Sequence, residues 1–535
     1  MNRSPNCMEE SLQPLAAWLE RHARLAAAAL LAFLLLIAIG VAAHKLFWYD
    51  ELITVFTASL PTTGDLLRFY SDGLDTTSPV ASLVARAGMH LPLPPELAVR
   101  FPFMLAFLGV PVGLYGFMRR RYSAGYALAA LVFPLAFPGF AYFMTEARAY
   151  ALMMGGAGLA MYFWQSAAEG KARPWSIPGL WLALAVAVGA HFFAVFLFVP
   201  FAAAQLALDW PRKRPDWPVW LALLLFPAGF LPFLQGTQRA SQYYRSAFHS
   251  KPDLGSFRIP YREIYVSGAW LTVSILLVLA IGWMLLERTH PDGSRQPEPA
   301  SPGLTRAEWM FAAVLTLYPI YVVLISMKLG VFRAQYALCF YIGFMVLVVA
   351  GLAEVLCRRA AAGALIFLVV VAAVTVTHAK SALGGFKALA HLSRVHNADV
   401  AEANDLHWLQ VASTSPLPLV LGPNPYVSLE YYGSPELRQR IYTLTDEADY
   451  GYPKYRLSVS DQQNFKLFSR MLPIHPTEID DFLAQHPHFL VETGFDEHEW
   501  IPDYLLRRQQ TKGDLSIRLL SNDESGTVLE VQMLK

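Results

Sequence analysis

The sequence predicts a mainly α-helical integral membrane protein, in which a polytopic bundle of about eleven spans is followed by a small soluble α/β domain. Hydrophobic residues make up 55% of the 535 residues and charged residues only 16%, a balance that is too apolar for a soluble protein of this size. Apolar runs recur along residues 25–379, whereas residues 380–535 are polar and interrupted by prolines. The formal net charge of +1 provides no global basic field of the kind that binds nucleic acid.

Eleven apolar runs approach the roughly 20 residues that a helix needs to cross the bilayer core. They occupy approximately residues 25–43, 97–117, 124–141, 144–165, 177–190, 192–208, 219–235, 264–286, 309–327, 334–356 and 363–379. The first run is too long for the apolar part of a signal peptide and lacks a cleavage site, so we interpret it as a retained helix. The chain thus divides into an N-terminal tail (1–23), a membrane domain (24–379) and an outer α/β domain (380–535).

Basic clusters predict the orientation, because the cytoplasmic loops of membrane proteins are enriched in lysine and arginine. Such clusters occur at residues 119–121, 171–173, 212–214, 288–306 and 358–359. All of them are cytoplasmic only if the nearly continuous stretches 124–165 and 177–208 each form a hairpin of two helices. Turn signals at 137–139 (Phe-Pro-Gly) and 189–191 (Gly-Ala-His) favour the two hairpins.

This arrangement predicts a multi-pass protein of the cytoplasmic (inner) membrane with a cytoplasmic N-terminus. The loop 45–96, the loop 236–262 and the C-terminal domain then lie on the outer, periplasmic or extracytoplasmic, side. The chemistry of the protein is therefore expected on that side of the membrane.

The C-terminal domain is predicted to mix strands and helices. Short strand-like runs occupy 417–421 and 489–492, and the runs 515–520 and 527–533 are typical of a hairpin. Residues 399–409 have helical periodicity. The three cysteines of the chain, Cys7, Cys339 and Cys357, have no spacing typical of a metal site or a disulfide framework.

The most informative local feature is the acidic pair Asp50-Glu51, which follows three aromatic residues just after the first span. Aromatic side chains are expected at a membrane interface. A desolvated Asp carboxylate at that place can act as a general base, while its neighbour orients it or binds an acceptor. The alternative is a pair of solvated acids at the end of a helix.

Asp75 begins a turn, continued by Ser78-Pro79, that is suited to cap the apolar segment 80–91. This segment is too short to span a membrane and predicts an interfacial helix in the first outer loop. Arg100 follows at the outer entrance of the second span.

Charged residues also stand where the fourth predicted span begins, at 146–150 (Glu-Ala-Arg-Ala-Tyr). As i, i+4 neighbours on a helix, Glu146 and Tyr150 are expected to share a face, with Arg148 pointing elsewhere. A cation in the first turn opposes the helix dipole, so Arg148 is expected to have an anionic partner. Charges inside membranes are functional more often than not, and the alternative is a structural ion pair with an acid of the first loop.

Further candidates stand on the predicted outer face. His191 lies at the tip between two spans, Arg333 precedes Tyr336 by three positions at the start of the tenth span, and Arg245 belongs to the loop 236–262. A lone His is often only a hydrogen-bonded core residue, and loop charges are most often solvated. Arginines that converge at the outer boundary are nonetheless suited to bind a lipid-linked phosphate, because a guanidinium can hold phosphate oxygens in a bidentate way.

In this order and on one membrane face, these elements resemble the GT-C superfamily of polytopic lipid-linked glycosyltransferases. The resemblance is to the family 39-like branch that contains dolichyl-phosphate-mannose protein mannosyltransferases and bacterial aminoarabinose or galacturonic-acid lipid A transferases. It covers about residues 25–360. The segments that carry it are 50–51, 78–79, 96–100, 146–150, 189–193 and 333–336.

The resemblance implies inverting transfer of a sugar from a polyprenyl-phosphate-linked donor to a hydroxyl of a glycan, lipid or protein acceptor. It implies that Asp50 is the base and that Glu51 assists in acceptor placement. Donor-phosphate candidates are Arg148, Arg333, His191 and Arg245, and substrate-binding candidates are Asp75, Glu146, Tyr150 and Tyr336. No metal is predicted, since the mannosyltransferase-like branch generally uses none, although other GT-C branches use a divalent cation.

Two other functions are alternatives. A lipid-linked sugar flippase or other transporter is expected to show repeated halves, broken helices and polar groups in mid-membrane. A non-catalytic assembly protein for cell-envelope polysaccharide is expected to use Asp50 and Arg148 only as an ion pair. The polar residues gather at the outer boundary, and transport requires neither a large first loop nor a soluble tail, so the glycosyltransferase hypothesis is preferred.

Overall fold

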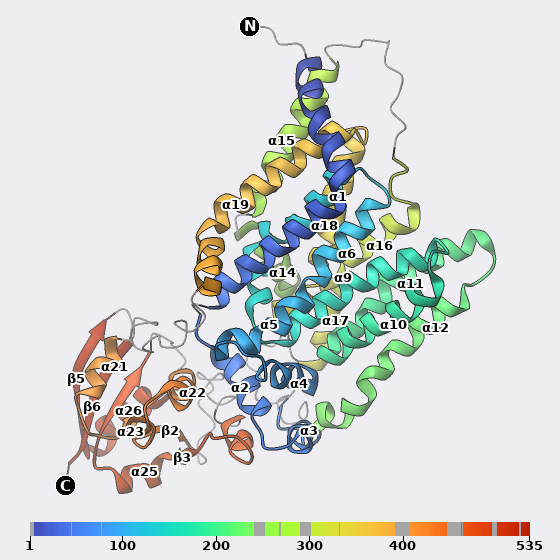
Figure 1. Ribbon diagram of the computed structural model, residues 1–535. Coiled ribbons are helices and arrows are strands. Elements are labelled where there is room, and N and C mark those ends of the chain that lie inside the picture. Colours follow the sequence, from blue (N-terminus) through green and yellow to red (C-terminus); the bar gives the residue numbers. More distant parts are fainter. Residues whose placement is uncertain are drawn as a thin grey trace.

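The computed structural model describes residues 5–43, 45–75, 77–239, 252–266, 269–288, 301–330, 332–390, 407–446, 462, 464–494, 500–523 and 526–534. These residues form a helix bundle with a mixed-sheet domain at one end, beside the helices of the first loop (Figure 1). The predicted class, a membrane helix bundle followed by a C-terminal α/β domain, is confirmed.

The bundle is built from helices that coincide with the predicted apolar runs. Its α-helices are α1 (Pro5–Ala42), α5 (Pro95–Phe107), α6 (Gly109–Arg119), α7 (Ala124–Val132), α8 (Pro138–Tyr142), α9 (Ala149–Ala168), α10 (Arg173–Ala190), α11 (Phe198–Arg212), α12 (Trp217–Leu225), α14 (Ile259–Val266), α15 (Ala269–Arg288), α16 (Arg306–Thr316), α17 (Tyr318–Leu329), α18 (Phe340–Val355) and α19 (Ala360–Ala390). Short 3₁₀ segments connect several of them: η1 (Phe133–Ala136), η2 (Phe143–Thr145), η3 (Phe192–Leu197), η4 (Phe226–Phe233), η5 (Leu254–Arg258) and η6 (Ala334–Ala337).

Fewer helices than predicted are long and apolar enough to cross a membrane without a break. Among the described residues five meet that description, Glu10–Ala42, Pro95–Arg119, Phe192–Arg212, Trp217–Arg239 and Ala360–Ala390, and two bent pairs raise the number to seven. The other predicted runs are helical, but among the described residues they are shorter or less apolar than this description requires. The number of eleven crossings therefore stays a prediction.

Both continuous stretches are broken where the turn signals predicted. Helix α7 with η1 ends at Ala136, and the helix that restarts at Pro138 is bent by 79° from it. Helix α10 ends at Ala190, and His191 has an extended backbone (φ −146°, ψ 118°) before η3 begins. The stretch 177–208 thus contains two helical segments. The stretch 124–165 contains three, because a second break at residues 146–148 separates α8 and η2 from α9.

The first and last apolar helices of the bundle pack closely against each other through small residues. A Cβ atom added to Gly40 of α1 would lie 1.8 Å from the carbonyl oxygen of Ser381 in α19, and one on Gly385 would lie 2.1 Å from that of Leu36. Such contacts let helix backbones approach directly in an apolar medium. Helix α1 also extends into the predicted tail 1–23, with a kink at His22 (φ −112°, ψ 20°).

The loop after α1, which the sequence predicts to be on the outer side, contains three short helices, α2 (Tyr49–Ala58), α3 (Thr63–Ser71) and α4 (Pro79–Gly88). The predicted capping turn is confirmed, since the Ser78 hydroxyl accepts a hydrogen bond from the backbone N–H of Val80 and Pro79 occupies the first helical position. Arg86 of α4 donates to the carbonyl oxygens of Ala58 and Leu60 at 3.2 and 2.7 Å. These bonds fix α4 against the end of α2.

The C-terminal domain contains one six-stranded mixed sheet in the order β3-β2-β1-β4-β6-β5. Its strands are β1 (Leu419–Val420), β2 (Ile441–Thr445), β3 (Pro476–Glu478), β4 (His488–Thr493), β5 (Leu515–Asp523) and β6 (Gly526–Met533). Its helices are α21 (His407–Ser413), α22 (Pro423–Tyr432), α23 (Pro435–Arg438), α25 (Ile479–Gln485) and α26 (Trp500–Lys512). Strands β3, β2, β1 and β4 are parallel, whereas β6 pairs antiparallel with β4 and β5.

The predicted strands of this domain are confirmed, including the terminal hairpin of β5 and β6. Most of the predicted helix 399–409 lies outside the described residues, and α21 begins at His407.

Candidate active site

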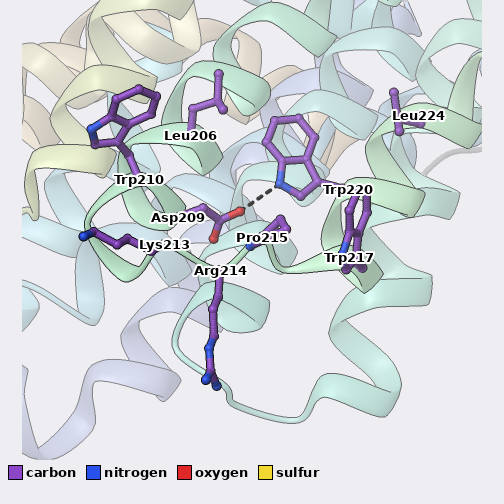
Figure 2. A pocket seen from close by; sticks show the side chains of 9 residues that line it. All are labelled: Leu206, Asp209, Trp210, Lys213, Arg214, Pro215, Trp217, Trp220 and Leu224. Atoms are coloured by element: carbon purple, nitrogen blue, oxygen red, sulfur yellow. Dashed lines mark hydrogen bonds between the residues drawn. The ribbon is translucent and has the colours of Figure 1, made fainter.

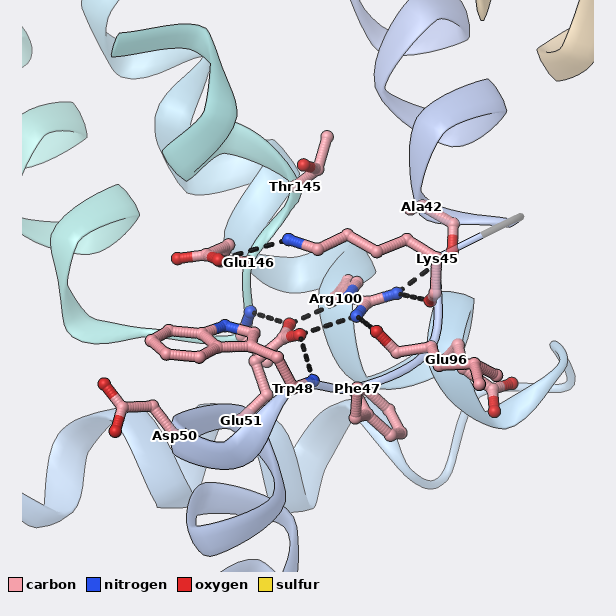
Figure 3. A network of polar contacts seen from close by, with 12 residues as sticks. Ala42, Lys45, Phe47, Trp48, Asp50, Glu51, Glu96, Arg100, Thr145 and Glu146 are labelled. Carbon is pink, nitrogen blue, oxygen red and sulfur yellow. Dashed lines mark hydrogen bonds and ion pairs between the residues drawn. The ribbon is translucent and has the colours of Figure 1, made fainter. Parts of the chain in front are cut away.

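Asp50 and Glu51 occupy the first turn of α2, where negative charge is favourable beside the helix N-terminus. Adjacent residues on an α-helix point about 100° apart, so the two carboxylates face different surroundings. Figure 3 shows Glu51 directed into a network of polar contacts and Asp50 directed away from it. Glu51 is therefore the buried member of the acidic pair, and Asp50 is the accessible one.

The Glu51 carboxylate forms a fully buried, two-point ion pair with Arg100 of α5. Arg100 Nε lies 2.8 Å from Glu51 Oε1 and Nη2 lies 2.6 Å from Oε2, and neither side chain is exposed. The same guanidinium donates to the carbonyl oxygens of Ala42, Lys45 and Leu46. Arg100 thereby holds the end of α1, the start of the first loop and α2 together.

Glu51 also fixes the segment that precedes α9. Its Oε1 accepts a hydrogen bond from the backbone N–H of Ala147 at 2.8 Å, and its Oε2 accepts one from Trp48 N–H at 3.4 Å. Since its oxygens are occupied by protein donors, Glu51 is not placed to contact an acceptor directly. We assign it a positioning role for Asp50 and for the segment around residue 147.

The prediction that Glu146 and Tyr150 share a helical face is wrong. Helix α9 begins only at Ala149, and both Glu146 (φ −118°, ψ 138°) and Arg148 (φ −128°, ψ 157°) are extended. The physical reason is that the bond from Ala147 N–H to Glu51 holds this segment away from a helical conformation. Glu146 instead pairs with Lys45 at 3.1 Å, with its side chain buried.

Arg148 has the anionic partner that the sequence predicted, and the partner is Asp50. Arg148 Nη2 lies 3.5 Å from Asp50 Oδ2, and Nη1 donates to the Asp50 carbonyl at 2.9 Å and to Thr54 Oγ1 at 3.1 Å. The Asp50 side chain remains 23% exposed. Arg148 Nε is buried and has no hydrogen-bond partner among the described residues.

A second group of candidates surrounds the Tyr336 ring in η6. The Tyr336 hydroxyl lies within electrostatic range of Asp50, Asp75, Arg148 and Arg333. Tyr150, at the start of α9, lies within range of the Tyr336 hydroxyl and of both arginines. Segments that are far apart in the sequence thus bring these charges to one place.

His191 belongs to the same cluster but contacts rings rather than acids. Its ring centroid lies 5.0 Å from that of Tyr336 and 5.4 Å from that of Tyr150, and the residue is 6% exposed. Its Nδ1 has no hydrogen-bond partner within the part of the chain that is described. His191 therefore lies among aromatic rings, and its Nδ1 is a polar atom within this otherwise apolar part of the site.

Asp75 lies at the edge of this cluster. Its carboxylate accepts hydrogen bonds from the backbone N–H and the hydroxyl of Thr77, both at 3.0 Å. Burial, with the Asp75 charge as the next cause, raises the pKa of Tyr70, so this phenol stays neutral and bonds Ser82 at 2.7 Å. Asp75 is thus held in place beside the predicted phosphate ligands.

The structure accordingly brings together most of the predicted site residues: Asp50, Asp75, Arg148, Tyr150, His191, Arg333 and Tyr336. Glu51 and Glu146 lie in the neighbouring buried network, and Arg245 lies outside the described residues. Among the described residues no group of three His, Cys, Asp or Glu side chains is arranged to hold a metal ion.

The sequence analysis missed the contribution of the C-terminal domain to this region. The Tyr432 hydroxyl in α22 accepts a hydrogen bond from Phe47 N–H at 2.9 Å and donates one to Glu96 Oε1 at 3.0 Å. Burial and the nearby Glu96 charge raise the pKa of Tyr432, which keeps the donor proton in place. The adjacent Tyr431 ring packs edge-on against Phe47, 5.8 Å between centroids.

Two more aromatic contacts reinforce this connection. Tyr49 stacks with Phe465 at 6.2 Å, and Phe69 stacks with Phe468 at 5.9 Å. The C-terminal domain thus packs directly on α2 and α3, the helices of the loop after α1. The unusual density of aromatic residues in 426–432 and 465–468 is the only sequence signal for it.

Comparison with known proteins supports the fold. Residues 76–235 match the family described as dolichyl-phosphate-mannose-protein mannosyltransferase. No curated protein sequence matches the chain significantly. The chain is a polytopic membrane protein with the fold of the GT-C glycosyltransferases, as the resemblance predicted.

Two solved structures share this fold along nearly the whole chain, and both are of ArnT from Cupriavidus metallidurans. The apo structure superposes with a TM-score of 0.53 at 16% identity, and the structure bound to undecaprenyl phosphate with a TM-score of 0.52 at 15% identity. In both cases the match covers 94% of this chain and 97% of the other.

We expect Glu51→Ala to destabilise the protein far more than Asp50→Ala. Removing Glu51 leaves Arg100 buried without its counter-charge, which typically costs about 3–5 kcal/mol. Asp50 is partly exposed, so water can replace part of its contact with Arg148. The measurement is the fraction of monodisperse protein in detergent after heating. Equal stability of the two variants would contradict the positioning role of Glu51.

Tyr432→Phe is expected to loosen the start of α2 while leaving the sheet domain folded. The variant lacks the hydroxyl that accepts from Phe47 N–H and donates to Glu96. Leaving these partly buried partners unpaired costs about 1–3 kcal/mol of stability. Hydrogen exchange by mass spectrometry should show faster exchange in residues 45–58. The control is Tyr504→Phe, whose hydroxyl bonds Asp480 within the C-terminal domain. Unchanged exchange in 45–58 would show that Tyr432 does not hold this segment.

Proposed function

We propose that the protein transfers a sugar from a polyprenyl-phosphate-linked donor to an acceptor hydroxyl on the outer face of the cytoplasmic membrane, with inversion at the anomeric carbon. The observation that carries the proposal is the convergence of Asp50 with Arg148 and Arg333 around Tyr336. The fold shared with ArnT, which has been solved with undecaprenyl phosphate, supports the choice of donor class.

The chemistry of such a transfer requires two kinds of group. The hydroxyl nucleophile is weak, so a base must accept its proton as the new bond forms. The leaving group is a phosphate that gains negative charge in the transition state, so cations must be fixed beside it in advance. Asp50 provides the partly exposed carboxylate that is proposed as the base. Arg148 and Arg333 provide the positive charge beside the leaving phosphate.

Arg148 is proposed to serve both groups. Its Nη atoms hold Asp50 and Thr54, while its buried Nε has no hydrogen-bond partner among the described residues. Arg333 also interacts electrostatically with the Tyr336 hydroxyl and has an extended backbone (φ −136°, ψ 147°) like that of Arg148. A phosphate between the two guanidinium groups would have charge on both sides and tyrosine hydroxyls beside it.

The location of the charges favours this function over transport. Asp50, Arg148 and Arg333 lie at helix starts and in the segments between helices, not in the middle of a span. This position suits a reaction between a membrane-embedded donor and an acceptor outside the membrane. The sheet domain packs on the same loop and is proposed to face the acceptor side.

Asp50→Asn is expected to reduce sugar transfer by about 10²- to 10⁴-fold, the usual contribution of a general base. Purified enzyme is incubated with labelled polyprenyl-phosphate sugars and a membrane extract, and products are identified by mass spectrometry. Asp72→Asn, an exposed acid of the same loop, serves as the matched control and should keep full activity. Near-normal transfer by Asp50→Asn would remove Asp50 from the role of base.

Arg333→Ala is expected to weaken binding of the lipid donor and to leave the choice of acceptor unchanged. Loss of a charge-assisted contact of about 1.5–3 kcal/mol corresponds to roughly a 10- to 100-fold increase in the KM for the donor. Arg333→Lys should recover part of the loss, since it keeps the charge without the two-point contact. Arg239→Ala is the control, because this exposed arginine donates to the Ser71 carbonyl. An unchanged donor KM in Arg333→Ala would exclude Arg333 from the phosphate site.

A further inference from the structure

An open cavity of about 660 Å³ lies far along the chain from the catalytic candidates, where α11 ends and α12 begins. The helices are joined by a short turn in which Lys213 has a left-handed backbone (φ 52°). Figure 2 shows Trp210 and Lys213 on one side of the cavity and Trp217 and Trp220 on the other, with Asp209 between them. The turn belongs to one of the predicted cytoplasmic basic clusters.

The acidic groups in this region are already occupied. The Asp209 carboxylate accepts hydrogen bonds from Trp220 Nε1 at 2.8 Å, Gln205 Nε2 at 3.0 Å and the Asp216 backbone N–H at 3.1 Å. The Asp216 carboxylate holds the Arg173 guanidinium through bonds of 2.8 and 2.6 Å. Asp216 is therefore paired with Arg173, and the oxygens of Asp209 are already held by neutral donors.

Two cations of the lining are left without such a partner. Within the described residues, Lys213 and Arg214 form no ion pair. They stand at the ends of two helices that are long and apolar enough to cross a membrane, Phe192–Arg212 and Trp217–Arg239. Because the ends of such helices are expected at the membrane surface, these charges are expected near the level of the lipid phosphates.

The remaining lining is apolar and unusually exposed. Trp210 is 83% and Trp217 62% exposed, and Leu206 and Leu224 are 52% and 54% exposed. Tryptophan is favoured at the membrane interface because its ring is apolar and its N–H can donate a hydrogen bond. The two leucines lie further along the helices, in the direction of the bilayer core. The cavity therefore has a basic end and an apolar end.

We propose that this cavity binds one anionic phospholipid, with the phosphate held by Lys213 and Arg214 and an acyl chain lying along Leu206 and Leu224. Charge complementarity selects an anionic headgroup over a zwitterionic one, because Lys213 and Arg214 together outweigh the single charge of Asp209, the acid of the lining. The two exposed tryptophans fit the ester region between headgroup and chains. The site is independent of the proposed glycosyl transfer, which uses the other set of arginines.

The test is native mass spectrometry of the full chain in detergent, titrated with phosphatidylglycerol and with phosphatidylcholine. The wild type should retain one phosphatidylglycerol about tenfold more tightly than phosphatidylcholine. Lys213→Ala/Arg214→Ala should lower this preference to near unity. Lys171→Ala/Arg306→Ala, a matched pair of exposed basic residues elsewhere, should leave it unchanged.

Several results would overturn the proposal. These are equal affinity for the two lipids in the wild type, an unchanged preference in Lys213→Ala/Arg214→Ala, and an equal loss in both double variants. Inorganic phosphate added in excess should not displace the lipid, since it lacks the acyl chains, and full displacement would show an anion site instead. Loss of a dimer in the Lys213→Ala/Arg214→Ala variant, with no change in lipid binding, would assign the cavity to a second copy of the chain.

Discussion

The buried ion pair between Glu51 and Arg100 is the interaction on which the rest of the candidate site depends. Charges buried in this way are retained only when nearly all their hydrogen-bonding groups are satisfied, and here the backbone provides the additional partners. The pair connects the end of α1, the first turn of α2, the N-terminal half of α5 and the segment before α9. Asp50 and Arg148 are neighbours of this cluster in the chain, so its geometry sets theirs.

This dependence explains why two adjacent acids have different roles. Helical geometry turns Glu51 toward Arg100 and turns Asp50 toward Arg148, at the accessible edge of the cluster. The same carboxylate of Glu51 holds the backbone of Ala147, which keeps Arg148 out of the helix and free to reach Asp50. One buried group thus positions both a base candidate and a phosphate-ligand candidate.

Local patterns in the sequence predicted a large part of this arrangement. Apolar runs located the helices, Pro and Gly located the breaks near Phe137 and His191, and alternating patterns located the terminal hairpin of the sheet. Asp50 and Arg148 stood out because charges near a membrane boundary are costly. These predictions rest on interactions between residues close in the chain or with the bilayer.

What the sequence could not predict depends on contacts between distant segments. The i, i+4 reasoning for Glu146 and Tyr150 failed because a carboxylate about 96 positions away in the chain captures the intervening backbone N–H. Nothing near Arg100 distinguishes a buried structural arginine from a phosphate ligand. Tyr432 bonds residues of the first loop from the far end of the chain, and only the tertiary structure reveals that contact.

The central claim is that Asp50, Arg148 and Arg333 surround one phosphate-binding site, and a structure of the full chain with undecaprenyl phosphate in lipid nanodiscs tests it most directly. The account predicts phosphate density within hydrogen-bond distance, about 3 Å, of both guanidinium groups, with the Asp50 carboxylate facing the same space. Phosphate bound elsewhere, or Asp50 separated from it by the Glu51 and Arg100 cluster, would contradict the account.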